Sequence, residues 1–222
     1  ISQEGLTKQY GLGVGKNIYD SIRTENKADD MQNYIVATAA AAADVRMSGG
    51  TKAVMTICGS GNQGITATLP VIAAVLSLKA DEEMLYRSLA LSCLITIHVK
   101  QFIGKLSPLC GCGMGSSIGV GCALTYLQGG GLSQIRSAIN NMIADVSGII
   151  CDGAKAGCAL KIATVISSAY QCSLLALRDL GAGELDGIVR ADVENSIRNL
   201  GELGNRGMAD TDRVILDMMV CR

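Results

Sequence analysis

The amino-acid sequence predicts a mainly α-helical domain whose functional site is carried by glycine-rich loops. Three observations support this fold class. The chain has only two prolines, 49% of its 222 residues are hydrophobic, and the segments between glycine clusters place apolar residues at helical rather than alternating spacing. This apolar content is enough for a substantial core. We expect residues 1–222 to form a single domain.

The first two predicted helices are separated by a short segment and a glycine-rich loop. Residues 29–47 are alanine-rich, with acidic residues at the start and a Ser-Gly-Gly stop at the end. After a short segment that could be a strand or an extended lead-in, residues 59–64 are expected to form a loop. A helix over residues 66–78 would then hold Pro70 in its first turn, where proline is tolerated.

The next helix, residues 81–101, has Asp81 as its expected N-cap and acidic residues in its first turn. Its apolar stretch, residues 84–99, falls short of the roughly twenty residues that span a bilayer. We therefore expect no membrane span here and a helix that is buried on most sides.

The remaining helices are expected at residues 116–127, 133–149 with Ser133 as the cap, 155–177, 190–200 and 211–219. In the last of these, the residues that share one apolar face predict a helix docked on the core. These residues are Val214, Ile215, Met218 and Met219.

Charge and cysteine content narrow the functional classes. The net charge of −1 and the absence of tryptophan argue against nucleic-acid binding. Nine cysteines in a chain of this length, with no recognisable secretory leader, favour reduced thiols in the cytoplasm over a disulfide scaffold. Because the chain starts at Ile1 without methionine, we expect it to be part of a longer protein.

Two cysteine motifs are the strongest functional signal. Cys110 and Cys112 lie in the run LCGCGMGSSIGVG, and Cys151 and Cys158 bracket CDGAKAGC, seven positions apart. Spacing alone leaves even odds between packing cysteines and a metal site. The glycines and Asp152 favour the metal site, because thiolates from separate segments are the ligands of iron–sulfur clusters. Four further cysteines lie in helices or apolar stretches and are assigned to packing: Cys58, Cys93, Cys122 and Cys172.

The run GSGNQG, residues 59–64, is a weaker signal. A glycine-rich loop before a helix binds phosphates and carboxylates, but this run lacks the features of a Walker or Rossmann loop. The alternative is a simple N-terminal helix turn. His98, the only histidine, fits a core residue better than a catalyst, although the nearby Lys100 and Lys105 favour contact with an anion.

Together GSGNQG, HVKQFIGKLSPLCGCG and NMIADVSGIICDGAKAGCALK resemble the serine dehydratase alpha-chain family, and more closely its L-cysteine desulfidase branch. The resemblance covers nearly the whole chain and corresponds to the C-terminal half of such proteins. It implies a 4Fe–4S lyase without pyridoxal phosphate, whose open iron acts as a Lewis acid. By motif, the ligands would be Cys110, Cys151 and Cys158, with Cys112 as the alternative to Cys110.

The resemblance also implies how a small amino-acid substrate is bound. Ser60, Asn62 and Gln63 would bind it, while the catalytic base would belong to a missing N-terminal region, so its identity is unknown. Some serine dehydratases end in a cysteine that caps the fourth iron. Cys221 could be such a ligand, although we favour an unrelated terminal thiol.

The expected reaction is release of sulfide and ammonia from L-cysteine to give pyruvate. L-serine dehydration is the alternative within the family. A cluster-binding or thiol-based sensor without turnover, and a domain with structural cysteines only, are the alternatives outside it. A homo-oligomer is compatible with each.

Overall fold

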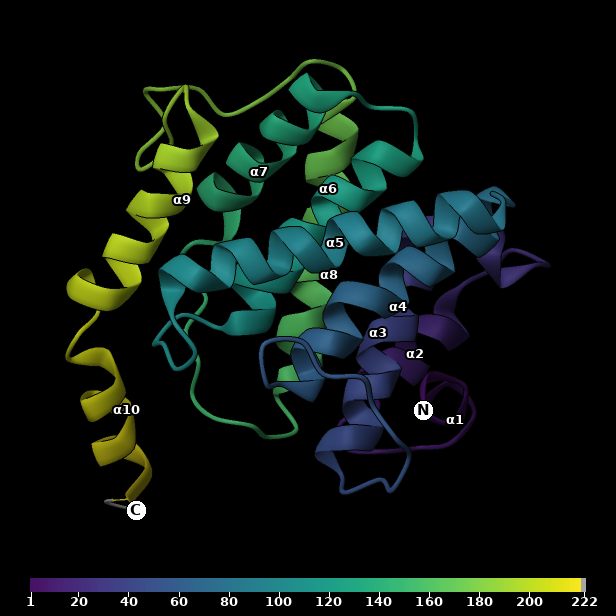
Figure 1. Cartoon of the computed structure of the whole chain (residues 1–222). Coiled ribbons are helices and arrows are strands. Elements are labelled where there is room, and N and C mark those ends of the chain that lie inside the picture. The colour runs from purple at the N-terminus through teal and green to yellow at the C-terminus, as the bar shows by residue number, and fades with distance from the viewer. Residues whose placement is uncertain (221–222) are drawn as a thin grey trace.

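The computed structural model describes residues 1–220, which form a helical domain with no β-strand among them (Figure 1). The ten α-helices are α1 (Ser2–Thr7), α2 (Val14–Ser21), α3 (Met31–Met47), α4 (Gly61–Leu78), α5 (Glu82–Ile103), α6 (Ser117–Leu127), α7 (Leu132–Val146), α8 (Cys158–Ala176), α9 (Val193–Glu202) and α10 (Thr211–Val220). A 3₁₀ turn (Lys27–Asp29) and two π-helical turns (Cys112–Ser116 and Leu203–Gly207) complete them. The predicted mainly α fold class is confirmed.

Helix α6 lies at the centre of the domain. Every residue from Ser117 to Thr125 is buried, and α6 packs against α4, α5, α7 and α8. Helix α3 packs against α8 and α4 and is in turn covered by α1 and α2. Its run of alanines is fully buried because small side chains let four helices approach it closely.

Helix α4 begins at Gly61, five residues before the predicted start at Thr66. Ser60 is the N-cap and its hydroxyl accepts the Gln63 N–H at 3.4 Å. The run GSGNQG is therefore mostly the first turn of a helix, and the prediction of a loop over residues 59–64 is wrong. As a consequence Pro70 lies in the helix interior, where it removes the N–H that would donate to the Thr66 carbonyl.

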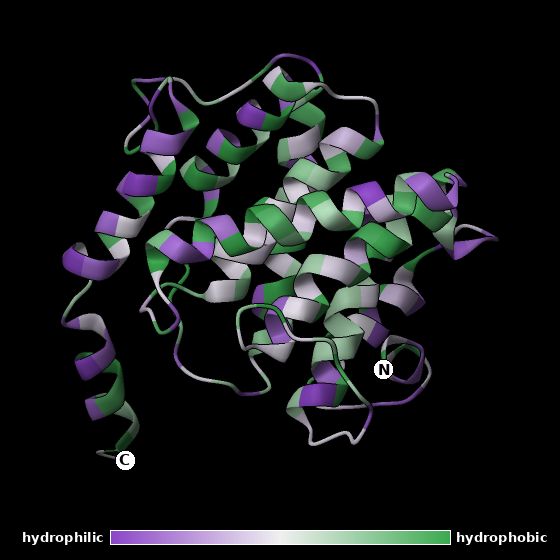
Figure 2. Ribbon diagram, in the orientation of Figure 1, coloured by the Kyte–Doolittle hydropathy of each residue, from purple (hydrophilic) through white to green (hydrophobic). Residues whose placement is uncertain are grey.

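Helix α5 departs from the expectation of burial on most sides. Its buried face is formed by small polar residues, Ser88, Ser92 and Thr96, while Leu94 on the outer face is 64% exposed. The Ser92 hydroxyl donates to the Ala67 carbonyl at 2.7 Å, so the buried polar groups find backbone partners. Figure 2 shows the apolar residues along the outward side of α5.

The starts of α7 and α8 also differ from the prediction. Helix α7 begins at Leu132 after Gly131, so Ser133 lies inside its first turn and is not the cap. Helix α8 begins at Cys158, three residues later than expected. For the segment before GSGNQG the sequence left a strand or an extended lead-in open, and the structure forms no strand there. The segment ends in a tight turn in which Ile57 and Ser60 exchange backbone hydrogen bonds of 3.2 and 3.1 Å.

Helix α10 is not docked on the core, although its apolar face predicted this. None of its residues is buried, and Met218 is 69% exposed. In Figure 1 it lies to one side of the helical body, beyond α9. The pattern of apolar residues specified an amphipathic helix correctly, but an amphipathic pattern does not say which surface covers it.

Two helices, α4 and α8, are long and apolar enough to cross a membrane when judged by length and composition alone. Both are packed against other helices of the domain. The most apolar window of α4 is 67% buried inside the fold, and that of α8 is 39% buried. Core helices of globular domains pass the same test, so these two helices are weak evidence for a membrane span.

Candidate functional site

One cavity of about 600 Å³ collects the motifs singled out in the sequence. All six residues that the resemblance assigned to cluster and substrate line it: Ser60, Asn62, Gln63, Cys110, Cys151 and Cys158. Its walls come from the start of α4, the end of α5, the segment before α6 and the segment before α8. The cavity therefore joins regions that are far apart along the chain.

A short antiparallel bridge holds the two cysteine motifs side by side. The Cys110 N–H donates to the Ile149 carbonyl at 2.9 Å, and the Cys151 N–H donates to the Pro108 carbonyl at 2.6 Å. Because each bond involves the backbone of a cysteine or its neighbour, the register of this bridge brings both motifs to one side of the cavity. These two backbone hydrogen bonds thus set how the segments that carry Cys110 and Cys151 lie against each other.

Cys110 caps the helix that leads into α6. Helical winding begins at Gly111 and passes through the π-helical turn Cys112–Ser116, so the expected loop here is shorter than predicted. The Cys110 carbonyl accepts the Met114 N–H at 2.7 Å. A sulfur at this position meets free N–H groups of the first helical turn.

The local environment shifts the pKa values of the Cys110 and Cys112 thiols in opposite directions. A hydrogen bond from the Cys112 thiol, outweighing burial and aided by the N–H groups of Gly113 and Cys112 and by the charge of Lys161, lowers the pKa of Cys110 to about 6. The same hydrogen bond, together with burial, raises the pKa of Cys112 well above its ordinary value. Of the two thiols, Cys110 is therefore the one whose environment favours the thiolate, as expected for a thiol at a helix N-terminus.

Cys151 and Cys158 are half-buried on the opposite segment. The Cys158 thiol lies on the first residue of α8 and donates weakly to the Gly153 carbonyl at 3.8 Å. Lys161 fixes this segment, because its ammonium donates to the Ile150 carbonyl at 2.9 Å and to the Asp152 carboxylate. The hydrogen bond from Lys161 lowers the pKa of Asp152.

Cys58 also lines the cavity, and its assignment to packing is wrong. It occupies the tight turn before Ser60 and has a φ of 50°, in the left-handed region that few residues other than glycine adopt. The signal that sequence reasoning overlooked is its place directly before the glycine of GSGNQG. Cys112 likewise faces the cavity, so the structure does not choose between Cys110 and Cys112 as a ligand.

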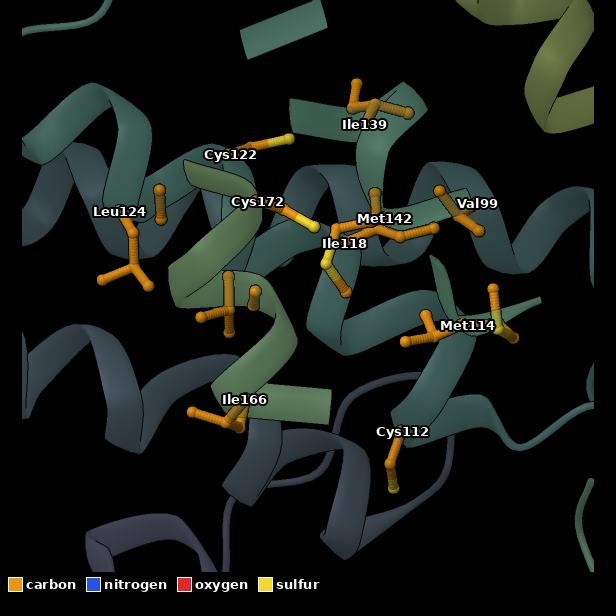
Figure 3. Packing of buried hydrophobic residues seen from close by; sticks show 14 of the residues in the cluster. Val99, Cys112, Met114, Ile118, Cys122, Leu124, Ile139, Met142, Ile166 and Cys172 are labelled. Carbon is orange, nitrogen blue, oxygen red and sulfur yellow. The ribbon is translucent and has the colours of Figure 1, made fainter. Parts of the chain in front are cut away.

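The other assignments to packing hold for Cys122 and Cys172. Both are buried in the main core, and burial raises the pKa of each to about 12. Figure 3 shows them among Ile118, Ile139 and Met142, whereas the Cys112 side chain lies apart from this group. Cys93 is half-buried on α5 and does not line the cavity.

The three predicted substrate residues differ in how their polar groups are engaged. The Ser60 hydroxyl caps α4. The Asn62 amide oxygen accepts from Arg46 at 2.9 Å, so it is already paired. By contrast, the Gln63 Oε1 atom is buried and has no hydrogen-bond partner among the described residues. Gly111 lies directly beside this amide, since a Cβ there would be 2.7 Å from Gln63 Nε2 and would displace the end of the side chain.

Lys100 is a cavity residue whose location the sequence did not reveal. It is buried at the end of α5, among the thiols of Cys58, Cys110 and Cys112. His98, two residues earlier on α5, does not line the cavity. Its ring nitrogen pairs with Glu194 of α9 at 2.9 Å, and the ring packs edge-on against Phe102. His98 is thus a structural residue, and the anion near it is a carboxylate of α9.

The donor set fits an iron–sulfur cluster better than a single metal ion. Within residues 1–220 no three cysteine, histidine, aspartate or glutamate side chains converge closely enough to hold one ion. A cluster presents several irons, so its thiolates need not meet at one point. Five thiols around one cavity, with lysines nearby to offset thiolate charge, match this requirement in chemistry.

The fold and the cavity define a helical domain with a thiol-lined pocket at a helix N-terminus. The family model described as serine dehydratase alpha chain matches residues 1–217, and the chain belongs to this family. The comparison does not identify the branch. Cys221 lies outside the described residues, so its predicted roles stay untested.

Relatives support the family assignment. The chain is 45% identical over 222 residues to a UPF0597 protein of Oleidesulfovibrio alaskensis, covering 100% of this chain and 52% of the relative. It is 46% identical over 220 residues to a UPF0597 protein of Clostridium perfringens, covering 99% of this chain and 52% of the relative. The chain thus spans about half the length of the curated relatives it matches. No solved structure matches it.

Proposed function

We propose that the protein is a 4Fe–4S amino-acid lyase that converts L-cysteine and water to pyruvate, sulfide and ammonia. The observation that carries this proposal is the convergence of five thiols and the N-terminus of α4 on one cavity. Family membership supports an amino-acid lyase. The choice of L-cysteine rests on the resemblance to the desulfidase branch.

In this proposal Cys110, Cys151 and Cys158 hold the cluster. When bound, the cluster supplies an iron with an open position that polarises the β-substituent of the substrate. Cys110 suits a ligand role because its lowered pKa favours the thiolate, the form that binds metals. The Asp152–Lys161 pair holds the second ligand segment in place.

The start of α4 is the proposed substrate subsite. The Ser60 hydroxyl accepts the Gln63 N–H, but the first-turn N–H groups before it have no carbonyl partner within the helix. They lie at the positive end of the helix dipole, which suits a carboxylate. The unpartnered Gln63 Oε1 atom offers an acceptor to the substrate ammonium group. We propose that Ser60 and Asn62 act mainly by shaping this turn, through the N-cap and the contact with Arg46.

The catalytic base is not assigned to any residue of this chain. We propose that it comes from the region by which the relatives are longer, since this chain spans 52% of the first relative. An oxygen-sensitive cluster of this kind fits a reducing cytoplasm.

The test is an anaerobic preparation of the whole protein. Iron and acid-labile sulfide are measured per chain, and pyruvate release is followed with L-cysteine and with L-serine. The proposal expects close to four irons per chain and faster turnover of L-cysteine. Faster turnover of L-serine would instead identify a serine dehydratase. A loaded cluster without pyruvate from either amino acid would identify a sensor and refute the enzyme.

A further inference from the structure

Lys100 is the only lysine or arginine within residues 1–220 that is buried, with 6% of its surface exposed. Its ammonium has no carboxylate within ion-pair distance among the described residues. Its one polar contact is the carbonyl of Lys105, at a long 3.4 Å. Burying an ammonium group is costly unless anions lie near it, and here the nearest acidic groups are the cavity thiols of Cys58, Cys110 and Cys112. A carboxylate ligand in the cavity would add a partner that the described residues do not provide.

Packing fixes the position of the Lys100 side chain. A Cβ at Gly115 would lie 3.1 Å from Lys100 Cγ, which shows that the aliphatic stem lies directly against the π-helical turn before α6. The residue lines the same cavity as the first turn of α4. With its stem packed in this way and 6% of its surface exposed, Lys100 holds its charge at the cavity and does not extend it into open solvent.

The same cavity also contains a buried hydrogen-bond acceptor that no described residue donates to. Gln63 is 6% exposed and its Oε1 atom lacks a donor. A ligand that contacts both groups would offer an anion to Lys100 and an N–H donor to Gln63. An α-amino acid zwitterion carries a carboxylate and an ammonium group on one carbon, and so supplies both.

We propose that Lys100 binds the carboxylate of an α-amino acid while Gln63 Oε1 accepts a hydrogen bond from its ammonium group. This inference rests on the proposed function, because it names the residues that recognise the substrate class. The carboxylate has two oxygens, one for Lys100 and one for the N–H groups at the start of α4. The side chain of the amino acid is then left to face the thiols.

The experiment measures ligand binding apart from catalysis. The whole protein is purified anaerobically, its cluster is removed by chelation, and L-serine is titrated calorimetrically. Two analogues follow, ethanolamine without the carboxylate and 3-hydroxypropanoate without the amino group. The variants are Lys100→Met, Lys100→Arg and Gln63→Leu. Lys52→Met is the control, because it removes the same charge from an exposed residue outside the cavity.

Removing the carboxylate from the ligand is expected to weaken binding about ten- to hundred-fold in the wild type and little further in Lys100→Met. Lys100→Arg should recover part of the loss. Gln63→Leu should abolish the preference for L-serine over 3-hydroxypropanoate. Unfolding of ligand-free Lys100→Met should occur at the same or a higher temperature, since an unpaired buried charge is replaced by an apolar chain of similar length.

Three results would overturn the inference. If Lys100→Met binds L-serine as tightly as the wild type, the carboxylate lies elsewhere, while pyruvate release by the wild type would leave the proposed function standing. If Lys100→Met instead loses iron on reconstitution but keeps its discrimination against ethanolamine, the lysine serves the cluster. If the wild type neither binds amino acids nor forms pyruvate, the inference fails together with the proposed function.

Discussion

Cys110 differs from the seven other cysteines that the structure describes in what its sulfur contacts. It combines the N-cap position of a helix with a hydrogen bond from a neighbouring thiol and a lysine charge nearby. Each of these favours the thiolate, and together they outweigh burial. Cys122, buried in the core without such donors, shows the reverse and has its pKa raised to about 12.

This difference predicts a pH dependence of stability for the cluster-free protein. The pKa of Cys110 falls from 9.0 to about 6 on folding, so its contribution is fully present above pH 9 and is lost as the pH drops through 6. The free energy of unfolding in urea should therefore rise between pH 6 and 9. Above that range Cys112 opposes the trend, because its raised pKa keeps it protonated in the folded state.

The control is Cys110→Ser, whose hydroxyl does not ionise in this range. Its unfolding free energy should lose the rise between pH 6 and 9. A rise of the same size in wild type and variant would mean that another group is responsible. The measurement is made under anaerobic, reducing conditions to keep the thiols free.

The ligand assignment predicts a contrast between two cysteine-to-alanine variants on α8. Cys158→Ala should lose nearly all iron and acid-labile sulfide on anaerobic reconstitution, because a cluster thiolate is removed. Cys172→Ala, on the same helix but buried in the core, should keep both and lose only about 1 kcal/mol of stability. Equal iron content in the two variants would refute the role of Cys158.

Sequence motifs identified the three proposed ligands but could not place Cys58 or Lys100. Cys58 follows an apolar run, and its left-handed turn becomes visible only when Ile57 and Ser60 are seen to exchange hydrogen bonds. Lys100 is a single charge on an apolar helix, which in a sequence usually indicates a solvated edge. Its burial depends on the close approach of Gly115 in the turn before α6. The spacing of residues along α5 carries no information about that contact.

At the level of elements, the contact between α5 and α6 shows how close packing replaces apolar burial. A Cβ at Gly119 would lie 2.3 Å from the Ser92 carbonyl and 2.6 Å from the Thr96 hydroxyl. The backbone carbonyl cannot move without shifting α5. Since the end of α5 carries Lys100, this contact also helps to position the part of α5 that lines the cavity.

Gly119→Ala is therefore expected to destabilise the domain by roughly 2–4 kcal/mol through overpacking. The matched control is Gly148→Ala, because a Cβ at Gly148 meets nothing within 4 Å. Its effect should stay within about 0.5 kcal/mol. Urea unfolding of both variants provides the measurement. Equal stability of the two variants would show that α5 adjusts freely against α6.

Helical periodicity predicted the existence of eight of the ten helices but set several of their ends wrongly. Glycine-rich runs at Gly61 and Gly111 were interpreted as loops, although each forms a first helical turn once a capping residue is available. Glycine lowers helix propensity by about 1 kcal/mol per residue, and here tertiary packing overrides it. For α10, the periodicity was right and the missing information was the surface it contacts.

For the molecule as a whole, the cavity is a meeting point of four segments that belong to different helices. The segments around Cys110 and Cys151 are joined by only two backbone hydrogen bonds, of 2.9 and 2.6 Å. Helix α3, by contrast, is buried along eleven consecutive residues, from Ile35 to Val45. Stability is therefore distributed unevenly, with the site at the less protected end.

Removal of the cluster should consequently act on a defined part of the fold. A ligand that binds only the folded state stabilises it by ~3 kcal/mol when present at 100 times its Kd, and the cluster would link segments that otherwise have few contacts. Chelation is expected to lower the melting temperature and to speed amide hydrogen exchange in residues 107–111 and 150–157. Exchange in α3 should not change, because its burial does not involve the cluster.

Comparison with Cys158→Ala makes the experiment decisive. This variant should show the fast exchange of residues 107–111 before any chelator is added, although the substitution lies nearly fifty positions away in the sequence. Cys172→Ala should show it only after chelation. If chelation left the exchange of both segments unchanged in the iron-loaded wild type, the thiols of the cavity would not be joined by a cluster. If it accelerated exchange in α3 equally, the cluster would act on global unfolding and not on these segments.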